Sequence, residues 1–125
     1  MGFLDAIMGN ASEIDPQEVS EELAPILSSN ESVERVYKEI RDMYVFTSMR
    51  LILIDKQGLT GKKVEYHSVP YKSITNFKVE TAGHFDMDAE FEFWISGQSA
   101  SVKKELKKDT ATGIQQTLAE FMFAK

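Results

Sequence analysis

The segment that follows Gly83 has the residue types and spacing of a metal-ion site. His84, Asp86 and Asp88 stand at alternate positions, so an extended chain would place all three side chains on one face. Imidazole nitrogens and carboxylate oxygens are both ligands for divalent metals. The alternative is that His84 lies in a turn and the two acids flank an exposed strand edge. No further histidine or glutamate-rich loop completes a ligand set, so we favour the alternative and expect no metal and no cofactor.

Carboxylates recur at alternate positions just beyond this segment, at Asp88, Glu90 and Glu92. Paired carboxylates can act in general acid–base chemistry if a pocket separates their pKa values. On an outward strand face, such side chains are usually solvated and paired with bases across the sheet. A lysine run further along the chain could supply those bases or form a weak anion site: Lys103, Lys104, Lys107 and Lys108. Aromatic residues do not interleave with this run, so we predict no nucleic-acid binding.

The remaining candidates for chemistry are weaker. The segment Gly58–Lys63 contains glycines and lysines, but it joins two predicted strands, whereas a phosphate-binding loop joins a strand to a helix. His67 alternates outward on a predicted strand, with neither a nucleophile nor an orienting partner, and is expected to be solvated. The chain has no cysteine, which excludes thiol nucleophiles and disulfides. We therefore predict that the protein is not an enzyme.

Length and composition are those of one soluble domain over residues 1–125. The chain is 42% hydrophobic and 27% charged, and its net charge of −6 disfavours non-specific binding to nucleic acid or an anionic membrane. The N-terminal sequence lacks the basic region of a secretory signal. No apolar run approaches the roughly 18 residues that span a bilayer. We expect a cytoplasmic location.

An N-terminal helical arm is predicted over residues 1–30. Asp15 is a good N-cap, Pro16 suits the first helical position, and Pro25 should break the helix. The arm has a first apolar face, made of Phe3, Leu4, Ile7 and Met8, and a second, made of Val19, Leu23, Ile26 and Leu27. Each face must be buried against something, either against the same chain, with Trp94 as one possible contact, or against a neighbouring subunit.

Strands are predicted over residues 33–107 and a capping helix over residues 110–124. The clearest strand is 88–96, where alternation places Ala89, Phe91, Phe93 and Ile95 inside and Asp88, Glu90, Glu92 and Trp94 outside. Elsewhere we expect these residues to face inward: Val36, Ile40, Ala100, Val102 and Leu106. The final helix carries a stripe of Ile114, Leu118, Phe121 and Met122. The fold class is mainly β, with about seven antiparallel strands that close into a barrel or an orthogonal sandwich.

Several segments of this strand region resemble sequences of the bacterial pleckstrin-homology domain family. They are Arg50–Tyr66, Val69–Ile74, Phe77–Gly83, Phe85–Glu90 and Trp94–Gly97. The resemblance implies a pleckstrin-homology-like barrel capped by the C-terminal helix and a tendency to form ring-shaped homo-oligomers, and it implies no reaction.

Eukaryotic relatives in this fold bind phosphoinositides through a basic loop between the first two strands. Here that connection is Arg41-Asp42-Met43, which is short and sets one base beside one acid. We therefore expect no phosphoinositide or membrane binding.

Three hypotheses of function follow from the sequence. The favoured one is a non-enzymatic interaction and assembly module that forms a homo-oligomer, with protein partners and with Phe3, Leu4, Ile7 and Met8 as the candidate interface. The alternative is a domain that binds a lipid or another small ligand. An enzyme is the third, and the missing catalytic constellation argues against it.

Overall fold

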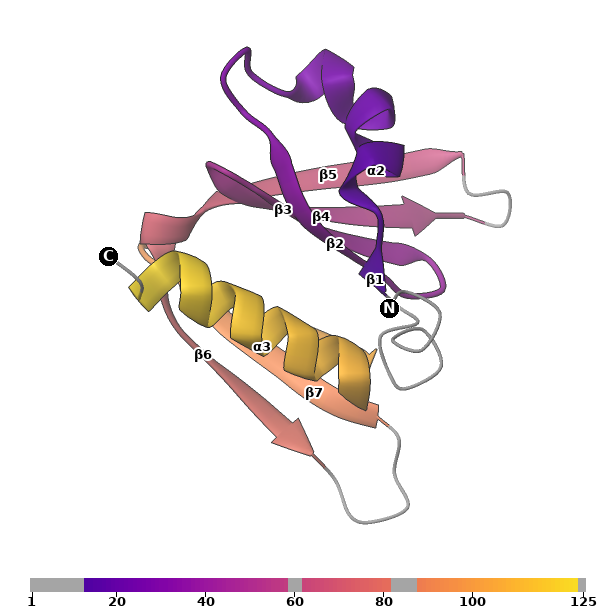
Figure 1. Ribbon diagram of the computed structural model, residues 1–125. Helices are drawn as coiled ribbons and strands as arrows, with labels where there is room; N and C mark the ends of the chain where they lie inside the picture. Colours follow the sequence, from indigo (N-terminus) through magenta and orange to yellow (C-terminus); the bar gives the residue numbers. More distant parts are fainter. Residues whose placement is uncertain (1–12, 59–61, 82–87, 124–125) are drawn as a thin grey trace.

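The computed structural model describes residues 13–58, 62–81 and 88–123 (Figure 1). The described part begins with the two-residue strand β1, which is followed by two helical elements. Seven longer strands come next, with one 3-10 turn among them, and a long helix comes last. In chain order, the elements are β1 (Glu13–Ile14), α2 (Pro16–Leu23), η2 (Ala24–Ile26), β2 (Val33–Lys38), β3 (Asp42–Thr47), β4 (Arg50–Gln57), β5 (Lys63–Pro70), η3 (Tyr71–Ser73), β6 (Ile74–Thr81), β7 (Asp88–Ile95), β8 (Val102–Lys107) and α3 (Lys108–Phe123).

The strands form two antiparallel sheets. Sheet A contains β1 to β5 in sequence order, and sheet B contains β6 to β8. Helix α2 lies on one side of sheet A, whereas α3 and sheet B lie on the other side (Figure 1). Because sheet A is covered on both faces, the molecule has two apolar cores separated by one sheet. The predicted class, mainly antiparallel β with helices at both ends, is confirmed.

The inner core lies between the two sheets and α3. Its buried members come from both sheets and the helix, and they include Tyr37, Tyr44, Phe46, Leu51, Leu53, Val69, Ile74, Ala89, Phe91, Phe93, Leu106, Ile114 and Leu118. The inward set predicted on β7 is buried as expected, because the alternation of that strand is unbroken. Aromatic stacking extends this core: the ring centroids of Tyr71 and Phe121 are 4.8 Å apart, with Phe46 beside both.

The outer core lies between sheet A and α2. Asp15 caps the helix by accepting a hydrogen bond from the Gln17 amide, and Pro16 occupies the first turn, as predicted. The members of this core are Val19, Leu23, Val36, Met43, Val45, Ile52 and Ile54, with Ile14, Leu27, Val33 and Val64 packed at the margin. This arrangement explains why β4 is apolar on both faces. Leu51 and Leu53 enter the inner core, whereas Ile52 and Ile54 enter the outer core.

Three residues predicted to face inward are exposed. Ile40 is 88% exposed, because β2 ends at Lys38 and Ile40 lies in the turn to β3. Ile26 is 41% exposed, because α2 ends at Leu23 and the 3-10 turn η2 breaks the helical period. Ala100 is exposed because β8 begins only at Val102. In each case, a strand or helix ends earlier or begins later than the apolar pattern indicated.

Other boundaries also differ from the prediction. Glu13 and Ile14, placed in the helical arm, instead form strand β1 and pair with Tyr37 and Val36. Strand β4 continues to Gln57, so the hairpin connection is shorter than the predicted 55–61. Helix α3 begins at Lys108, two residues before the predicted start.

Candidate functional site

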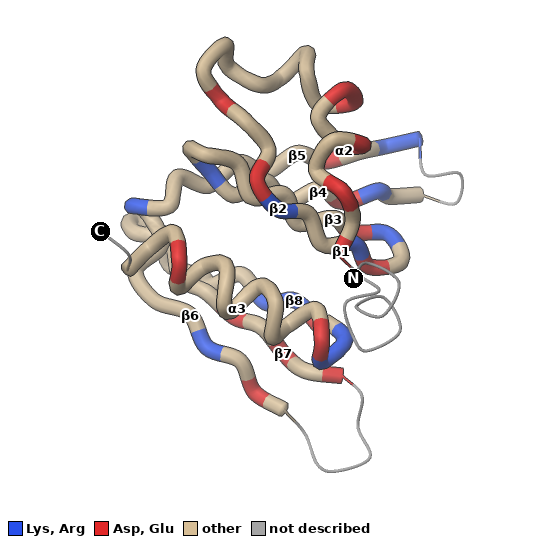
Figure 2. The backbone as a smooth tube through the Cα atoms, viewed as in Figure 1, with Lys and Arg blue, Asp and Glu red and all other residues tan. Residues whose placement is uncertain are grey.

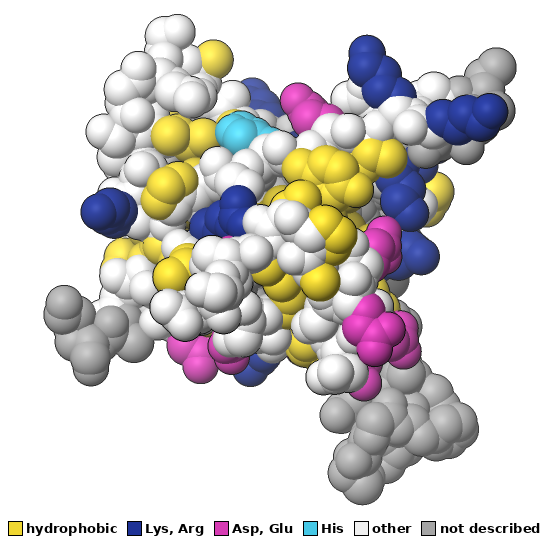
Figure 3. Space-filling model, turned by 90° about the horizontal axis from the view of Figure 1, so that it is seen from above, with side chains coloured by type: hydrophobic (Ala, Val, Ile, Leu, Met, Phe, Trp, Pro, Cys, Tyr) yellow, Lys and Arg dark blue, Asp and Glu magenta, His cyan; other side chains and the backbone are white. Residues whose placement is uncertain are grey.

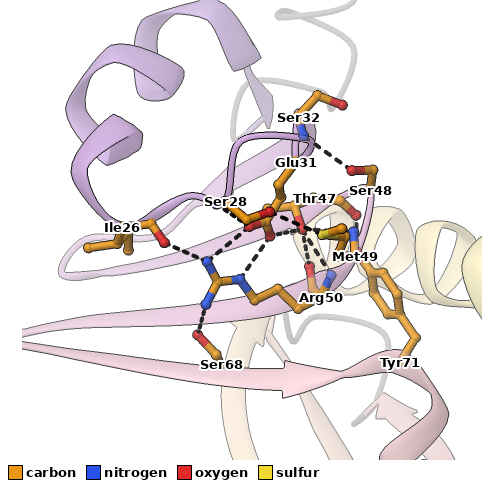
Figure 4. A network of polar contacts seen from close by, with 10 residues as sticks. All are labelled: Ile26, Ser28, Glu31, Ser32, Thr47, Ser48, Met49, Arg50, Ser68 and Tyr71. Carbon is orange, nitrogen blue, oxygen red and sulfur yellow. Dashed lines mark hydrogen bonds and ion pairs between the residues drawn. The ribbon is translucent and has the colours of Figure 1, made fainter.

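A polar network connects the loop after η2 to the β3–β4 turn and to β5 (Figure 4). Its centre is the buried carboxylate of Glu31, which meets the guanidinium of Arg50 in a fork. Arg50 Nε lies 2.8 Å from Oε2, and Arg50 Nη2 lies 3.0 Å from Oε1. Such bidentate contacts fix both the distance and the orientation of the two groups. We call this set the Glu31–Arg50 network.

Two further donors complete the coordination of the Glu31 carboxylate. Thr47 Oγ1 donates to Oε2 at 2.5 Å, and the Ser28 amide donates to Oε1 at 3.1 Å. Hydrogen bonding from Arg50 is the main reason that the pKa of Glu31 falls to about 2, against an opposing effect of burial. Thr47 Oγ1 also accepts the amides of Met49 and Arg50, which closes the turn between β3 and β4.

Arg50 joins three segments that are distant in sequence. Besides Glu31, its guanidinium donates to the carbonyl of Ile26 at 2.8 Å and to Ser68 Oγ at 2.8 Å. On the other side of the turn, Tyr71 Oη donates to the carbonyl of Thr47 at 2.7 Å. The network therefore fastens the end of the helical arm to sheet A, and it links that contact to the aromatic stack of the inner core.

Large apolar side chains are exposed around this network. Ile26 is 41% exposed, Met49 51% and Tyr66 47%. Ile26 supplies a carbonyl to Arg50, Met49 precedes Arg50 and accepts a hydrogen bond from Ser28 Oγ at 3.4 Å, and Tyr66 projects from the same face of β5 as Ser68. We call Ile26, Met49, Arg50 and Tyr66 the Arg50 surface.

The view over α2 and β5 shows this side of the molecule (Figure 3). Hydrophobic side chains lie open among uncharged ones, whereas Lys and Arg gather at the end of the β4–β5 hairpin. Tyrosine, methionine and arginine are enriched in protein–protein interfaces relative to the rest of protein surfaces. A guanidinium already fixed by an internal carboxylate would also lose little side-chain entropy on contact. The Arg50 surface thus combines exposed apolar side chains with a guanidinium whose orientation is fixed from inside the protein.

The metal site considered in the sequence has only one of its three residues in the described part of the chain. His84 and Asp86 lie outside the described residues, as do Phe3, Leu4, Ile7 and Met8. Asp88 is exposed at the start of β7 and stands opposite Lys107 of β8. Within residues 13–58, 62–81 and 88–123, no group of three or more metal-ligating side chains could hold an ion.

The predicted carboxylate face of β7 is only partly solvated. Glu92 is buried, which differs from the prediction, because Ser101 Oγ donates to it at 2.5 Å and Lys78 Nζ lies 3.8 Å away. Lys103 stands opposite Glu92, as expected of a basic partner across the sheet. Lys104 faces the other way, into the space between the sheets, because it stands opposite Phe91. The lysine run is thus divided between two faces and forms no single anion site.

Two more predicted residues lie in intermediate environments. His67 is half-buried and projects toward the inner-core side of β5, opposite Leu53, so it is less solvated than expected. Trp94 is half-buried on β7 of sheet B. The second apolar face of the arm, at Val19 and Leu23, packs on sheet A of the same chain rather than over Trp94.

Sequence reasoning missed Glu31, Thr47 and Arg50 as a group. The available signal was a lone acid in the loop before β2 and a lone base in front of the apolar run Leu51–Ile54. A charge at the margin of an apolar strand can indicate a partner from another segment. The sequence does not reveal which segment, because 19 positions separate these two charges.

Basic residues meet at the end of the β4–β5 hairpin (Figure 2). Arg41 Nη1 donates to the carbonyls of Gly58, at 2.6 Å, and Lys56, at 3.5 Å, and Lys62 and Lys63 follow on the second strand. The acidic side chains of Asp42 and Asp55 lie at the same end of the strands. Helix α2, by contrast, exposes acids. None of the described helices is long and apolar enough to cross a membrane.

Comparisons with known proteins agree with this architecture. The family model described as Bacterial PH domain matches residues 2–122. The chain is 54% identical over 121 residues to the uncharacterized protein YjqA of Bacillus subtilis (strain 168), which covers 95% of this chain and 97% of that protein.

Two solved structures are similar along nearly the whole chain. A pleckstrin homology domain from Shewanella amazonensis SB2B is 60% identical with a TM-score of 0.86, covering 98% of this chain and 100% of that one. A DUF1696 family protein with a pleckstrin-homology domain from Shewanella loihica PV-4 is 60% identical with a TM-score of 0.79, covering 90% and 97%. These matches span both sheets, so they concern the fold as a whole.

Proposed function

This chain belongs to the bacterial PH domain family, and from that premise we propose that it is a non-enzymatic interaction and assembly module that forms a homo-oligomer. The family and the fold expected from the sequence are confirmed. The proposal of assembly is supported chiefly by the Arg50 surface, where exposed apolar side chains share one side of the molecule with an arginine that an internal carboxylate already orients.

The arm contributes one candidate interface to this proposal. The second apolar face of the arm is already satisfied within the chain, since Val19 and Leu23 are buried in the outer core. The first face, predicted at Phe3, Leu4, Ile7 and Met8, lies outside the described residues and stays a candidate interface. A contact between two different patches, repeated from subunit to subunit, produces a ring when the rotation closes. Self-association of this kind would cover the Arg50 surface.

Light scattering at micromolar concentration tests assembly. We expect the intact chain to have a mass that is a multiple of its 14.2 kDa. Tyr66→Ala should lower that mass, because a truncated tyrosine at the centre of an interface often costs about 2 kcal/mol or more. Ile40→Ala is the matched control, since Ile40 is also an exposed apolar residue but lies at the β2–β3 turn.

Two outcomes would contradict this proposal in different ways. A monomeric mass for the intact chain would refute assembly itself. A mass that falls with Ile40→Ala and not with Tyr66→Ala would place the interface at the β2–β3 turn instead. A chain that lacks residues 1–12 keeps β1 intact, and an unchanged mass for it would remove Phe3, Leu4, Ile7 and Met8 from the interface.

Binding of an anionic lipid is the alternative function, and one observation favours it. Arg41 lies against the hairpin end that also carries Lys56, Lys62 and Lys63. However, Arg41 is engaged with backbone carbonyls, and the net charge of the chain is −6. We expect no co-sedimentation with phosphoinositide vesicles. Salt-sensitive co-sedimentation that disappears in Lys62→Ala would instead support the lipid function.

A further inference from the structure

The turn between β2 and β3 displays an isoleucine. Ile40 is 88% exposed, the largest exposed fraction among the large apolar side chains of the described residues. Turn centres usually hold glycine, proline, asparagine, aspartate or serine, so a β-branched apolar residue is unusual there. A single exposed apolar side chain is ordinary on a protein surface, and its surroundings decide whether it has a partner.

The backbone that carries Ile40 is fixed in place. The Glu39 amide donates to the carbonyl of Asp42 at 2.8 Å, so Ile40 and Arg41 are the two central residues of the turn. The carbonyl of Arg41 accepts the amide of Lys56 in β4 at 3.1 Å. Because the turn is bonded to both β3 and β4, the place where the Ile40 side chain meets the surface is fixed as well.

The chain enters β1 from the side of this turn. Strand β1 lies beside β2 and is antiparallel to it, with Glu13 opposite Tyr37 and Ile14 opposite Val36 (Figure 1). The direction that leads back from Glu13 toward the N-terminus is therefore the direction in which β2 runs toward its turn. Three residue steps, or about 10 Å, separate the level of Tyr37 from that of Ile40.

The other exposed apolar side chains lie further from the start of β1. Tyr66 lies on β5, four strand spacings or about 19 Å across sheet A. Ile26 and Met49 lie beyond the opposite end of β3. Helix α3 begins beside the β2–β3 turn, because Glu39 accepts a hydrogen bond of 3.4 Å from the end of β8, and Phe123 lies about 22 Å further along that helix.

We propose that the first apolar face of the arm packs over Ile40 of the same chain. That face consists of Phe3, Leu4, Ile7 and Met8. Five residue steps join Met8 to Glu13 and span up to about 18 Å of extended chain, which is more than the distance to Ile40 requires. Ile40 is not part of the Arg50 surface, so this contact neither requires nor prevents self-association there.

Charge and burial both favour the contact. The charged side chain within residues 1–12 is Asp5, whereas Lys38 and Arg41 are exposed at the turn. An isolated helix of this length is not stable in water, so the arm needs a surface that covers its apolar face. Docking over Ile40 gives the first face of the arm a partner in its own chain, as sheet A does for the second.

Methyl NMR of the isoleucines in the intact chain tests the contact. We expect nuclear Overhauser contacts between the Ile40 δ1 methyl and the first apolar face. The double variant Leu4→Ser with Ile7→Ser should abolish them and move the Ile40 signal, while the Ile26 methyl stays in place. Ala6→Ser is the matched control, because Ala6 lies in the same segment but off that face. An Ile40 signal that the double variant leaves unchanged would overturn the proposal.

An engineered disulfide decides whether the contact lies within one chain. The chain has no cysteine, so Ile7→Cys with Ile40→Cys creates a single possible pair. In glutathione buffer its effective concentration should exceed by about tenfold that of the control pair, Ile7→Cys with Phe123→Cys. Equal values for the two pairs would overturn the proposal. A disulfide between two chains, seen as a doubled mass on a denaturing gel without reductant, would overturn it by placing the arm on a neighbouring subunit.

Light scattering separates this inference from the proposed self-association. The double variant Leu4→Ser with Ile7→Ser should keep the mass of the unmodified chain, because the face that it alters is covered within the chain. A lower mass for this variant would overturn the inference by making the first apolar face an interface between subunits. A monomeric unmodified chain in which the Ile40 methyl contacts are present would refute assembly and support the inference.

Discussion

The two faces of sheet A are covered in different ways. On the inner side, sheet B and α3 bury aromatic rings in a large apolar core, where Phe46, Tyr71 and Phe121 stack face to face. On the outer side, the eight-residue helix α2 covers the sheet with two buried side chains, Val19 and Leu23. A helix this short is marginal by itself in water, so its position depends on what holds its ends.

The polar contacts compensate for this difference. The N-terminus of α2 is held by the Asp15 cap and by β1, and its C-terminal side is held by the Glu31–Arg50 network. The inner core needs no comparable brace, because the sheets and α3 surround it. Burial of apolar area therefore stabilises the inner side, whereas the Glu31–Arg50 ion pair holds the outer side in position. The exposed residues Ile26 and Met49 lie beside that ion pair.

Truncation in the inner core should have the largest effect. Phe93 is fully buried on β7, with its ring centroid 5.4 Å from that of Phe91. Phe93→Ala should reduce the free energy of unfolding by about 3–5 kcal/mol, measured by urea denaturation. A loss within about 0.5 kcal/mol, typical of surface substitutions, would mean that Phe93 does not belong to the core.

Breaking the outer brace should have a smaller effect that depends on pH. Glu31→Gln keeps the shape of the side chain but removes its charge, and should cost about 1.5–3 kcal/mol, as for hydrogen bonds to charged groups. The pKa of Glu31 is lowered to about 2 from its ordinary 4.5, so its stabilisation is present above pH 4.5 and is lost as pH falls toward 2.

Denaturation curves at several pH values check this prediction. The difference between the unmodified chain and Glu31→Gln should be largest at neutral pH and should shrink as pH falls from 4.5 toward 2. Glu34→Gln is the matched control, because Glu34 is an exposed glutamate in the neighbouring strand β2. A difference that stays constant down to pH 2 would show that the charge of Glu31 does not provide the stabilisation.

The smallest effect is expected where α3 meets sheet A. Gly113 faces the ring of Tyr37, and a methyl group there would come within 2.8 Å of Tyr37 Cζ and 2.9 Å of Tyr37 Oη. Gly113→Ala adds helix propensity of about 1 kcal/mol. Overpacking costs about 1–3 kcal/mol, so we expect a net loss of about 1 kcal/mol by thermal denaturation.

A matched substitution separates the two contributions in that experiment. Thr112 is exposed on the same helix, one position before Gly113, so Thr112→Ala raises helix propensity without adding an atom next to Tyr37. It should be stabilising by about 0.5 kcal/mol, because a β-branched residue is a weaker helix former than alanine. A net gain of stability in Gly113→Ala would contradict the close packing of Tyr37 against α3.

The class of fold could be predicted from the sequence, because its local signals agreed with one another. The inward residues of β7, the N-cap of α2 and the stripe of α3 each depend on neighbours within a few positions, and the structure confirms them. Failures occurred at element ends, as at Ile26 and Ile40. There the hydrophobic pattern continues, but the chain changes direction, in the 3-10 turn η2 at Ile26 and in the turn between β2 and β3 at Ile40.

Tertiary structure decided which charges meet. Glu31 and Arg50 come from segments that only the folded sheet brings together, and no local periodicity indicates such a pairing. It also decided that the second apolar face of the arm covers its own sheet. The physical reason is common to these cases: periodicity reveals that a side chain must leave water, but the partner it meets is set by the three-dimensional arrangement of the strands.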